Sequence, residues 1–319
     1  MTNRRILYLG NFTAPWCSEV HIARDFEYLG HDVVRLQEPP GGGSHATLAE
    51  LEEQATGADL VLWTRTWGLP PEATALWRRL EANGVQTASL HLDLYRGLAR
   101  QKQLKRDPFW STGHVFTPDG DPASAEFFAS LGINHRYSAP AVVSDECVPG
   151  NRHDRYDFDV VFVGSYGYHP EWPWRTHLID HLADRYGPRF RRFGGDLPEG
   201  PTRGQDLNDL YATARVVVGD SLCPPGHTRY WTDRYYETVG RGGFLIAPEV
   251  PGIEEHFDDG EHLRFYTHGD LDQIDSLVDH YVANPEEARL IANNGQAHVA
   301  ANHTYKHRLA ALLDTIGLG

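Results

Sequence analysis

Short runs of β-branched and other apolar residues alternate along this chain with longer stretches of helical period, and the alternation occurs in two series. This is the pattern of parallel βαβ units, in which helices connect the strands of one sheet. The first series predicts strands at residues 6–9, 33–36, 60–63, 87–90 and 115–117. The second predicts strands at residues 160–163, 190–193, 216–218, 244–247 and 263–266. We therefore expect an α/β protein with two doubly wound sheets.

Several segments between these strands place apolar residues on one helical face. After the first strand, Ile22 and Phe26 are followed by Leu29 at helical spacing, and Gly30 supplies a left-handed stop. Two later segments repeat the pattern, with apolar positions Leu207, Leu210, Tyr211 and Ala214 in one and Tyr305, Leu309, Leu312, Leu313 and Ile316 in the other. Asp206 is the expected N-cap of the helix over residues 207–214.

The length of 319 residues suits two domains, each able to bury a core without a disulfide or a metal. Residues 138–157 contain prolines, a glycine and many polar side chains, so we expect the domain linker there. The expected domains cover residues 1–140 and 151–302. Such sheets bind ligands at the carboxyl ends of their strands, and two of them in one chain suggest a cleft between domains.

Composition and charge narrow the functional classes. The cysteines Cys17, Cys147 and Cys223 are widely spaced, which favours a reducing compartment. The apolar run near the N-terminus is too short for a signal peptide, and no run reaches the roughly 18 residues of a membrane span, so a cytoplasmic location is expected. The 29 Lys and Arg against 44 Asp and Glu give a net charge of −15, which disfavours a nucleic-acid surface near neutral pH.

A glycine-bearing turn follows the first strand of each series. Residues 10–19 read GNFTAPWCSE and residues 164–175 read GSYGYHPEWPWR, and neither has the spacing of a nucleotide-binding loop. In the second turn, Gly164 and Gly167 permit close backbone approach, and a helix N-terminus with Arg175 would attract a phosphate. The turn itself also needs its glycines, so both interpretations stay open.

Residues 216–257 carry the most informative polar side chains. A strand leads to Asp220 and Ser221, and a short helix then contains Arg234 and Glu237. The last two lie three residues apart on one helix face, so they would either hold a diphosphate and sugar hydroxyls or form a simple ion pair. Their position after a strand of the second series favours the first interpretation.

These same residues carry a family resemblance. The segments LNDLYATARVVVGDS (207–221), YETVGRGGFLIAPEVPGIEEHF (236–257) and NHTYKHRLAALL (302–313) resemble the C-terminal donor domain of glycosyltransferases with the GT-B fold. The most similar subgroup is the CgeB-like, spore-protein-type group, which is related to glycosyltransferase family 4. EVHIA and LGHDVVRL, within residues 19–36, are similar to the first helix and second strand of those enzymes.

The resemblance implies two Rossmann-like domains facing each other across a cleft, with residues 303–319 forming a helix that packs back towards the N-terminal domain. It implies a hexosyltransferase whose donor, a UDP- or GDP-sugar, binds in the C-terminal domain, while the N-terminal domain holds the acceptor. It also implies retention of anomeric configuration, transfer without a bound metal, and no permanently bound cofactor.

The resemblance assigns residues as well. Family 4 enzymes carry an E-x7-E motif whose second glutamate binds the donor ribose; Glu237 matches that glutamate, and Arg229 stands where the first would be. Arg234 matches an arginine that precedes the helix glutamate in the subgroup, and the loop at residues 164–175 matches the glycine-rich donor loop. The expected donor-binding residues are thus Gly164, Ser165, Arg175, Ser221, Arg229, Arg234 and Glu237.

Glycosyl transfer builds negative charge on the departing diphosphate, and arginines together with helix N-termini would stabilise it. Acceptor binding or proton abstraction suits a carboxylate or an imidazole. We expect Asp93 in that role first, then His91 beside it and His21 in the first helix. An Asp after a strand is also commonly a helix N-cap, and a lone His is commonly structural.

Two rival functions and one negative expectation complete the analysis. The acceptor stays open among a small molecule, a glycan, a protein and a modified DNA base; the last rests on the basic run at residues 98–108, which a solvated helix face explains equally well. The second rival is a non-catalytic sugar- or nucleotide-binding protein with the same fold. No metal is expected, because His303 and His307 have helical spacing without an evident third ligand.

Overall fold

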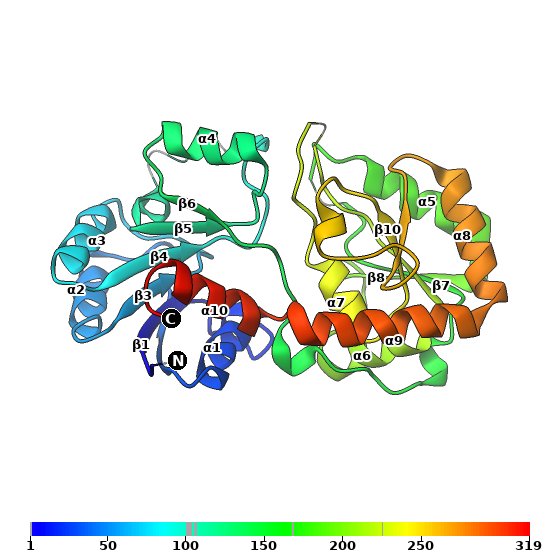
Figure 1. Ribbon diagram of the computed structural model, residues 1–319, viewed down its shortest axis with the longest axis horizontal. Helices are drawn as coiled ribbons and strands as arrows, with labels where there is room; N and C mark the ends of the chain where they lie inside the picture. The colour runs from blue at the N-terminus through cyan, green and yellow to red at the C-terminus, as the bar shows by residue number, and fades with distance from the viewer. Residues whose placement is uncertain (1, 100–103, 105–106, 168, 225) are drawn as a thin grey trace. The chain divides into compact units, whose positions relative to one another are not determined.

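The chain forms two compact units. The computed structural model describes residues 2–99, 104, 107–167, 169–224 and 226–319. One unit comprises Met1–Val143 and Tyr305–Gly319, and the other comprises Ser144–Thr304. Each unit holds one parallel sheet with helices on its faces (Figure 1). The two-sheet α/β architecture expected from the alternating sequence pattern is therefore confirmed.

The first unit contains a six-stranded parallel sheet in the order β2-β1-β3-β4-β5-β6. Its strands are β1 (Arg5–Gly10), β2 (Asp32–Gln37), β3 (Leu60–Trp63), β4 (Gln86–Leu90), β5 (His114–Thr117) and β6 (His135–Tyr137). The order reverses at β1, because β2 lies on one side of it and β3 on the other. Sheets of this type open a crevice outside the carboxyl ends of the strands at such a reversal.

Helices cover both faces of the first sheet. Helices α1 (Ser18–Tyr28) and α10 (Tyr305–Thr315) share one core with the inward side chains of β1 and β3. On the opposite face, α2 (His45–Gln54), α3 (Ala73–Ala82) and α4 (Pro122–Ser130) lie over a second core, which includes Trp63 and Trp77. The C-terminal helix thus belongs to the first unit, and the backbone N–H of Tyr305 donates to Val142 O at 2.9 Å where the chain returns.

The second unit contains a five-stranded parallel sheet in the order β11-β10-β9-β7-β8. Its strands are β7 (Val160–Val163), β8 (Phe190–Phe193), β9 (Val216–Val218), β10 (Leu245–Pro248) and β11 (Arg264–Tyr266). Helices α5 (Trp174–Tyr186), α8 (Leu271–Ala283) and the start of α9 (Pro285–Asn302) pack on its main core. Helices α6 (Gly204–Thr213) and α7 (Arg234–Gly240) complete the unit (Figure 1).

All of the strands expected from the sequence are present, and their ends differ from the expected ones by at most one residue. The structure adds β6, whose sequence HRY is polar because the strand lies at the edge of its sheet. The expected N-cap at Asp206 is wrong: α6 begins at Gly204 after Arg203, and Asp206 lies in its first turn. There its carboxylate forms an exposed ion pair with Arg155 and still favours the positive end of the helix.

Candidate functional site

A buried ion pair occupies the carboxyl edge of the second sheet. Arg175, in the first turn of α5, donates from Nε to both carboxylate oxygens of Asp220, at 3.1 and 3.0 Å, and its Nη2 lies 3.0 Å from Oδ1. The indole N–H of Trp172 donates to the same carboxylate at 3.2 Å. A side chain at Gly164, directly after β7, would bring its Cβ to 3.7 Å from Nη1 of Arg175. That is an ordinary contact distance, and the tighter neighbour is the ring of Phe162, whose Cε1 would lie 3.0 Å from the same Cβ.

A second set of contacts runs from the end of β9 into α7. The buried hydroxyl of Ser221 accepts the N–H of Thr232 at 3.2 Å, and the Thr232 hydroxyl accepts the N–H of Arg234 at 3.3 Å. Nη1 of Arg234 then donates to Oε2 of Glu237 at 2.7 Å. Burial would lower the pKa of Arg234, but Glu237 foremost, then Tyr211, raise it above its ordinary value. The two side chains form a partly exposed pair at the start of the helix.

The structure thus joins five of the expected donor-binding residues at one sheet edge. Arg175 binds Asp220 after β9, and a Cβ at Gly164, after β7, would lie 3.7 Å from Nη1 of Arg175. Ser221, next to Asp220, connects through Thr232 to Arg234, which pairs with Glu237. The i, i+3 ion pair considered from the sequence is present. The Arg234 guanidinium has five N–H donors, so this ion pair uses only part of its hydrogen-bonding capacity.

The other two expected residues lie on separate loops of the same unit. The exposed Ser165 hydroxyl donates to the backbone oxygen of Gly167 at 2.8 Å, which shapes the turn after β7. Arg229 has a left-handed backbone, with φ of 55°, and pairs with Glu255 in the turn that follows β10. The described contacts do not join Arg229 to Arg234 or Glu237.

Arg192 on β8 is a cation that the sequence reasoning missed. Its Nη1 donates to the backbone oxygen of Gly164 at 3.0 Å and to Oδ1 of Asp196 at 2.6 Å. The guanidinium, followed by the N–H of Tyr166, lowers the pKa of Asp196 to about 2. Arg192 therefore anchors the turn that begins at Gly164 to strand β8. The pattern FRRF in the strand is the only local signal for it, and such charges on an edge strand are commonly solvated.

The arginines at this edge share one property, which is that each has a carboxylate partner. The pairs are Arg175 with Asp220, Arg192 with Asp196, Arg229 with Glu255, and Arg234 with Glu237. An incoming anion would therefore meet guanidinium groups that a carboxylate already orients, together with the N-terminus of α5, whose first backbone N–H groups have no acceptor within the helix. This edge presents oriented donors with little net charge.

Aromatic side chains lie beside the buried pair. The ring of His268, after β11, stacks on Trp172 with ring centroids 4.9 Å apart and an interplanar angle of 27°. Trp174 meets the same imidazole edge-on at 4.9 Å. Burial lowers the pKa of His268, an effect that Asp220 partly opposes. A neutral imidazole between two indoles offers a flat surface of the kind that stacks on a planar ring.

A pocket of about 140 Å³ lies at the carboxyl edge of the first sheet. Its lining includes Glu19 from α1, Arg65 after β3, and His91 and Asp93 after β4. The N–H of Asp93 donates to Nδ1 of His91 at 3.1 Å, so neutral His91 carries its proton on Nε2. The structure therefore brings Asp93 and His91 together at this edge.

His21 lies apart from this pocket. It is in α1, its Nδ1 is buried without a hydrogen-bond partner in the described part of the chain, and it is not among the residues that line the pocket. Glu19, two residues earlier, lines it instead. Burial is the main reason that the pKa of Glu19 is raised, and the nearby Glu38 adds to the effect. Sequence reasoning missed Glu19, although the segment EVHIA contains it.

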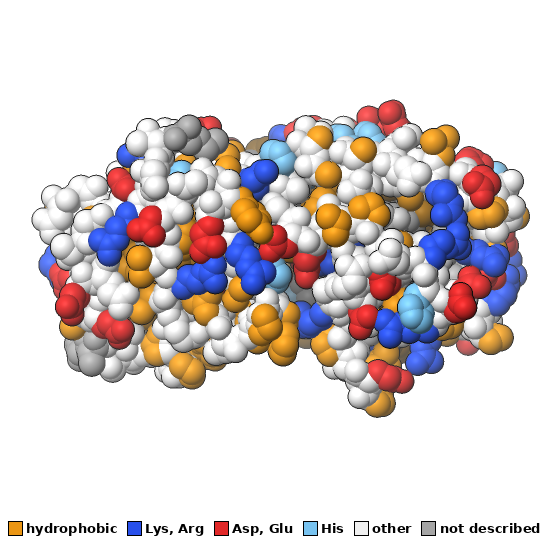
Figure 2. Space-filling view, turned by 90° about the horizontal axis from the view of Figure 1, so that it is seen from below, with side chains coloured by type: hydrophobic (Ala, Val, Ile, Leu, Met, Phe, Trp, Pro, Cys, Tyr) orange, Lys and Arg blue, Asp and Glu red, His pale blue; other side chains and the backbone are white. Residues whose placement is uncertain are grey.

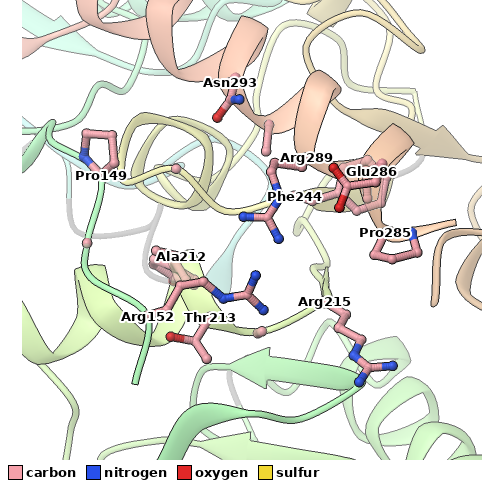
Figure 3. A pocket seen from close by; sticks show the side chains of 16 residues that line it. Pro149, Arg152, Ala212, Thr213, Arg215, Phe244, Pro285, Glu286, Arg289 and Asn293 are labelled. Atoms are coloured by element: carbon pink, nitrogen blue, oxygen red, sulfur yellow. The ribbon is translucent and has the colours of Figure 1, made fainter. Parts of the chain in front are cut away.

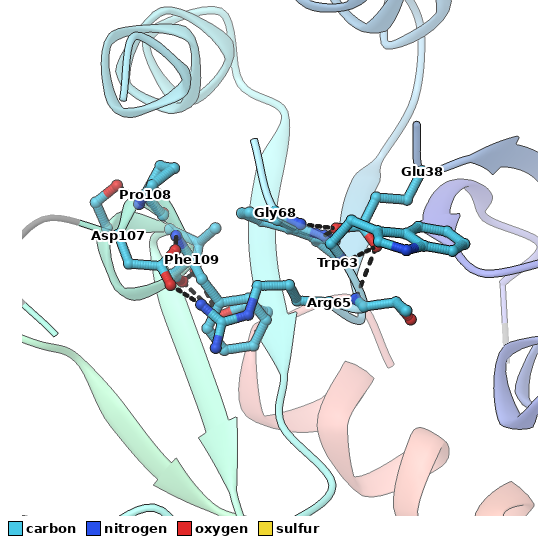
Figure 4. Close-up of polar contacts among 12 residues, drawn as sticks. Glu38, Trp63, Arg65, Gly68, Asp107, Pro108 and Phe109 are labelled. Atoms are coloured by element: carbon cyan, nitrogen blue, oxygen red, sulfur yellow. Dashed lines mark hydrogen bonds and ion pairs between the residues drawn. The ribbon is translucent and has the colours of Figure 1, made fainter. Parts of the chain in front are cut away.

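Glu38 is fully buried at the end of β2 and holds the loop that carries Arg65. Its carboxylate accepts the indole N–H of Trp63 at 3.0 Å and three backbone N–H groups, those of Thr66 at 2.7 Å, Trp67 at 2.9 Å and Gly68 at 2.8 Å. In Figure 4, Arg65 points away from the donors that surround the Glu38 carboxylate, toward Asp107 and over Phe109. Glu38 is thus a positioning residue for the wall of the pocket.

Two further expectations concern histidines and the basic run. Nε2 of His303 lies 3.1 Å from Nε2 of His298, and the described groups able to hold an ion are instead Asp258, Glu261 and His262, whose ligand atoms lie within 4.8 Å of one another. Both acids are exposed, and such groups are common without an ion. Within the basic run, residues 100–103 and 105–106 lie outside the described residues.

Comparison with known proteins finds one family model that matches part of the chain. Residues 157–314 match the model of a family described as glycosyl transferase-like. No curated protein matches the sequence. Within the described residues, no helix is both long enough and apolar enough to cross a membrane.

Several solved structures share the whole fold. The structure of HepE from Anabaena in complex with UDP-glucose has a TM-score of 0.63 and 14% identity, covering 99% of this chain and 100% of that one. A glycosyltransferase from Rickettsia africae has a TM-score of 0.65 and 11% identity, with coverage of 99% and 98%. Sucrose-phosphate synthase from Thermosynechococcus elongatus has a TM-score of 0.58 and 13% identity, with coverage of 98% and 99%. These likenesses establish the GT-B fold.

Proposed function

We propose that this chain, which carries a glycosyl transferase-like domain at residues 157–314, transfers a hexosyl group from a nucleoside diphosphate sugar to an acceptor. The HepE structure with UDP-glucose supports a UDP-sugar as the first donor to test, with a GDP-sugar as the second. The donor is assigned to the carboxyl edge of the second sheet and the acceptor to the pocket at the carboxyl edge of the first.

One observation carries this proposal. Ser221, Thr232, Arg234 and Glu237 form a continuous set of hydrogen bonds from the end of β9 into α7, inside the region that matches the family model. The Glu237 carboxylate is an acceptor for ribose hydroxyls, and the remaining N–H groups of Arg234 are donors for the diphosphate. Both roles were expected from the sequence, and the contacts hold the two groups in one orientation.

The leaving group would be stabilised by oriented donors. As the bond between the anomeric carbon and the diphosphate oxygen breaks, its electron pair passes to the diphosphate. Arg234, Arg175 and the N–H groups at the start of α5 would hold that charge, with Arg192 and Gly164 shaping the loop. Transfer without a divalent metal belongs to this proposal, and activity in excess EDTA is its direct test.

The acceptor hydroxyl would be bound by Asp93, with His91 and the buried Glu19 beside it in the same pocket. For a retaining transfer, the hydroxyl oxygen attacks the anomeric carbon on the face that the diphosphate leaves, and its proton passes to a departing phosphate oxygen. Asp93 then orients the hydroxyl and does not take the proton. The anomeric configuration of the product, read by NMR, tests this assignment.

A non-catalytic sugar- or nucleotide-binding protein is the second candidate. It is favoured by the carboxylate partners of all four arginines at the donor edge, since each pair lowers the positive charge available to a leaving group. Such a protein would bind the donor without turning it over.

The experiment is a thermal-shift screen with UDP, GDP, ADP, CDP and dTDP, followed by an assay for released nucleoside diphosphate from the matching sugar. A ligand that binds only the folded state raises the melting temperature by mass action. Binding with release of the diphosphate supports the transferase, and binding without release supports the second candidate. If none of the five nucleotides shifts the melting temperature, the proposal is wrong.

A further inference from the structure

A separate pocket of about 400 Å³ lies at the amino edge of the second sheet. Its walls come from the segments just before β9 and β10, from residues 149–152 and from the start of α9 (Figure 3). In a parallel sheet, the amino ends of the strands lie at the edge opposite to their carboxyl ends. This pocket is therefore distinct from the proposed donor site, whose residues follow β7 and β9.

Two arginines give this pocket a surplus of positive charge. The guanidinium groups of Arg152 and Arg289 point into the same space in Figure 3, whereas Arg215 points away. Arg215 lies 3.2 Å from Asp159 and is paired. Arg152 and Arg289 form no ion pair with any carboxylate of the described residues, although Glu286 lines the same pocket.

The contrast with the surrounding surface is informative. The chain has a net charge of −15, and on the face shown in Figure 2 the Arg side chains of the second unit lie among Asp and Glu. The arginines at the opposite edge of the sheet are all paired, as described above. Two arginines without a carboxylate partner among the described residues therefore line one pocket, and an anion bound there would neutralise their charge.

The backbone on both sides of Arg152 is fixed. The N–H of Asn151 donates to Oδ1 of Asp209 at 2.8 Å, and the N–H of His153 donates to the hydroxyl of Thr213 at 2.9 Å. Gly150 packs so closely that a Cβ there would lie 2.1 Å from the backbone carbon of Asn208. Arg152 is thus an exposed side chain on a held segment, and part of the cost of ordering the site is met before a ligand arrives.

The rest of the lining is suited to a small organic molecule. Phe244 and Ala292 contribute apolar surface, and Asn293 lies one turn after Arg289 on α9. A volume of about 400 Å³ falls within the range of small-molecule sites. Paired guanidinium groups bind phosphoryl oxygens through parallel N–H donors.

We propose that this pocket binds a small phosphorylated molecule between Arg152 and Arg289. The phosphoryl group would accept hydrogen bonds from both guanidinium groups, and the remainder of the molecule would lie against the apolar wall. The site is independent of the donor site, so the inference stands or falls separately from the proposed function.

The test is isothermal titration calorimetry of the full chain with inorganic pyrophosphate, glucose 6-phosphate and uridine monophosphate, each at concentrations up to millimolar. The three probes separate a site for a bare phosphate anion from one for a sugar phosphate or a nucleotide. Arg152→Gln and Arg289→Gln should each weaken the best probe about tenfold or more, equivalent to about 1.4 kcal/mol, and the double variant should abolish its binding. Both side chains are exposed, so the variants are expected to fold, and urea unfolding checks this.

Arg191→Gln is the matched control, because it removes one exposed arginine of the same unit that lies on β8 and pairs with Glu199 at 3.4 Å. Its effect on binding should be less than twofold. Glu237→Ala reports on the proposed donor site at the opposite edge of the sheet: a titration that this variant removes, while Arg152→Gln and Arg289→Gln leave it intact, belongs to the donor site and not to this pocket. The inference is overturned if no probe binds, if Arg191→Gln has the same effect as the pocket variants, or if Glu237→Ala abolishes binding while Arg152→Gln and Arg289→Gln do not.

Discussion

The carboxyl edges of the two sheets hold their acidic groups in different ways. In the first unit, Glu38 is surrounded by neutral donors, one indole N–H and three backbone N–H groups. In the second, Asp220 and Glu237 each face an arginine. Two sheets of the same topological class therefore present different chemistry at the same edge.

The two edges therefore differ in how they can bind a ligand. A carboxylate held by backbone N–H groups fixes a loop and cannot exchange its partners without unfolding that loop. A guanidinium that faces a carboxylate has further N–H groups to offer, so it can take an anion while it stays paired. In the proposed function, the first edge would hold the acceptor and the second the charged donor.

The largest expected effect comes from breaking the buried pair of the second unit. Asp220→Ala would leave the Arg175 guanidinium buried without its partner, which costs about 3 to 5 kcal/mol of unfolding free energy. Urea unfolding of the purified variant measures it. Asp206→Asn, which breaks an exposed pair with Arg155, should cost at most about 1 kcal/mol. Equal losses in the two variants would show that burial of the pair is unimportant.

Replacing the Glu38 carboxylate, which four neutral N–H donors surround, should have the next largest effect on the unfolding free energy. Glu38→Gln keeps the size of the side chain but turns an NH₂ group toward N–H donors, and two unsatisfied buried donors cost about 2 to 4 kcal/mol. Chemical denaturation followed by tryptophan fluorescence measures the loss. Exposed Glu53→Gln on α2 is the control and should be nearly neutral. A loss below about 0.5 kcal/mol for Glu38→Gln would contradict a stabilising role for the four hydrogen bonds to this carboxylate.

The partly exposed pair of Arg234 and Glu237 is expected to affect ligand binding more than stability. Glu237→Ala should remove the thermal shift given by the preferred nucleoside diphosphate, a stabilisation of about 2.7 kcal/mol at a hundredfold excess over Kd. Arg234→Gln should weaken the diphosphate more than the bare nucleoside. Glu199→Ala, on an exposed pair with Arg191, is the control. Retention of the full shift in Glu237→Ala would remove that residue from the donor site.

The smallest effect is a pH dependence at the first edge. Because burial raises the pKa of Glu19 above its ordinary 4.5, the folded chain keeps this proton to higher pH than the unfolded chain does. The stability that Glu19 contributes is full below pH 4.5 and is lost as the pH rises through the folded-state pKa. The unfolding free energy of the wild type should therefore decline relative to Glu19→Gln across that interval, as denaturation at a series of pH values would measure. A constant difference would contradict a raised pKa.

Local patterns in the sequence predicted most of the fold. Runs such as those at residues 60–63 and 160–163 are apolar because helices cover both faces of a parallel sheet, so the positions of these strands can be predicted from the sequence. The strand His135–Tyr137 was missed because an edge strand needs no apolar pattern. The sequence predicts an N-cap at Asp206, but the helix begins earlier, at Gly204, so Asp206 lies in its first turn.

The sites were only partly predictable, because their residues acquire a role through distant partners. Arg234 and Glu237 are three residues apart on one helix, so their pairing could be expected. Glu38 meets the loop at Thr66 only after β2 and β3 join the same sheet, and no local signal separates it from an exposed glutamate. Arg152 and Arg289 likewise come together only through the folding of the second unit.

The hydrogen bond from Tyr305 N–H to Val142 O has a consequence for protein engineering. The chain leaves the first unit after Val143 and re-enters it at Tyr305, so both crossings lie side by side and residues Ser144–Thr304 form one continuous insertion. A short glycine bridge between Val143 and Tyr305 would close that gap without stretching the backbone. The six-stranded unit could then be expressed without the insertion and its pocket titrated with acceptors alone.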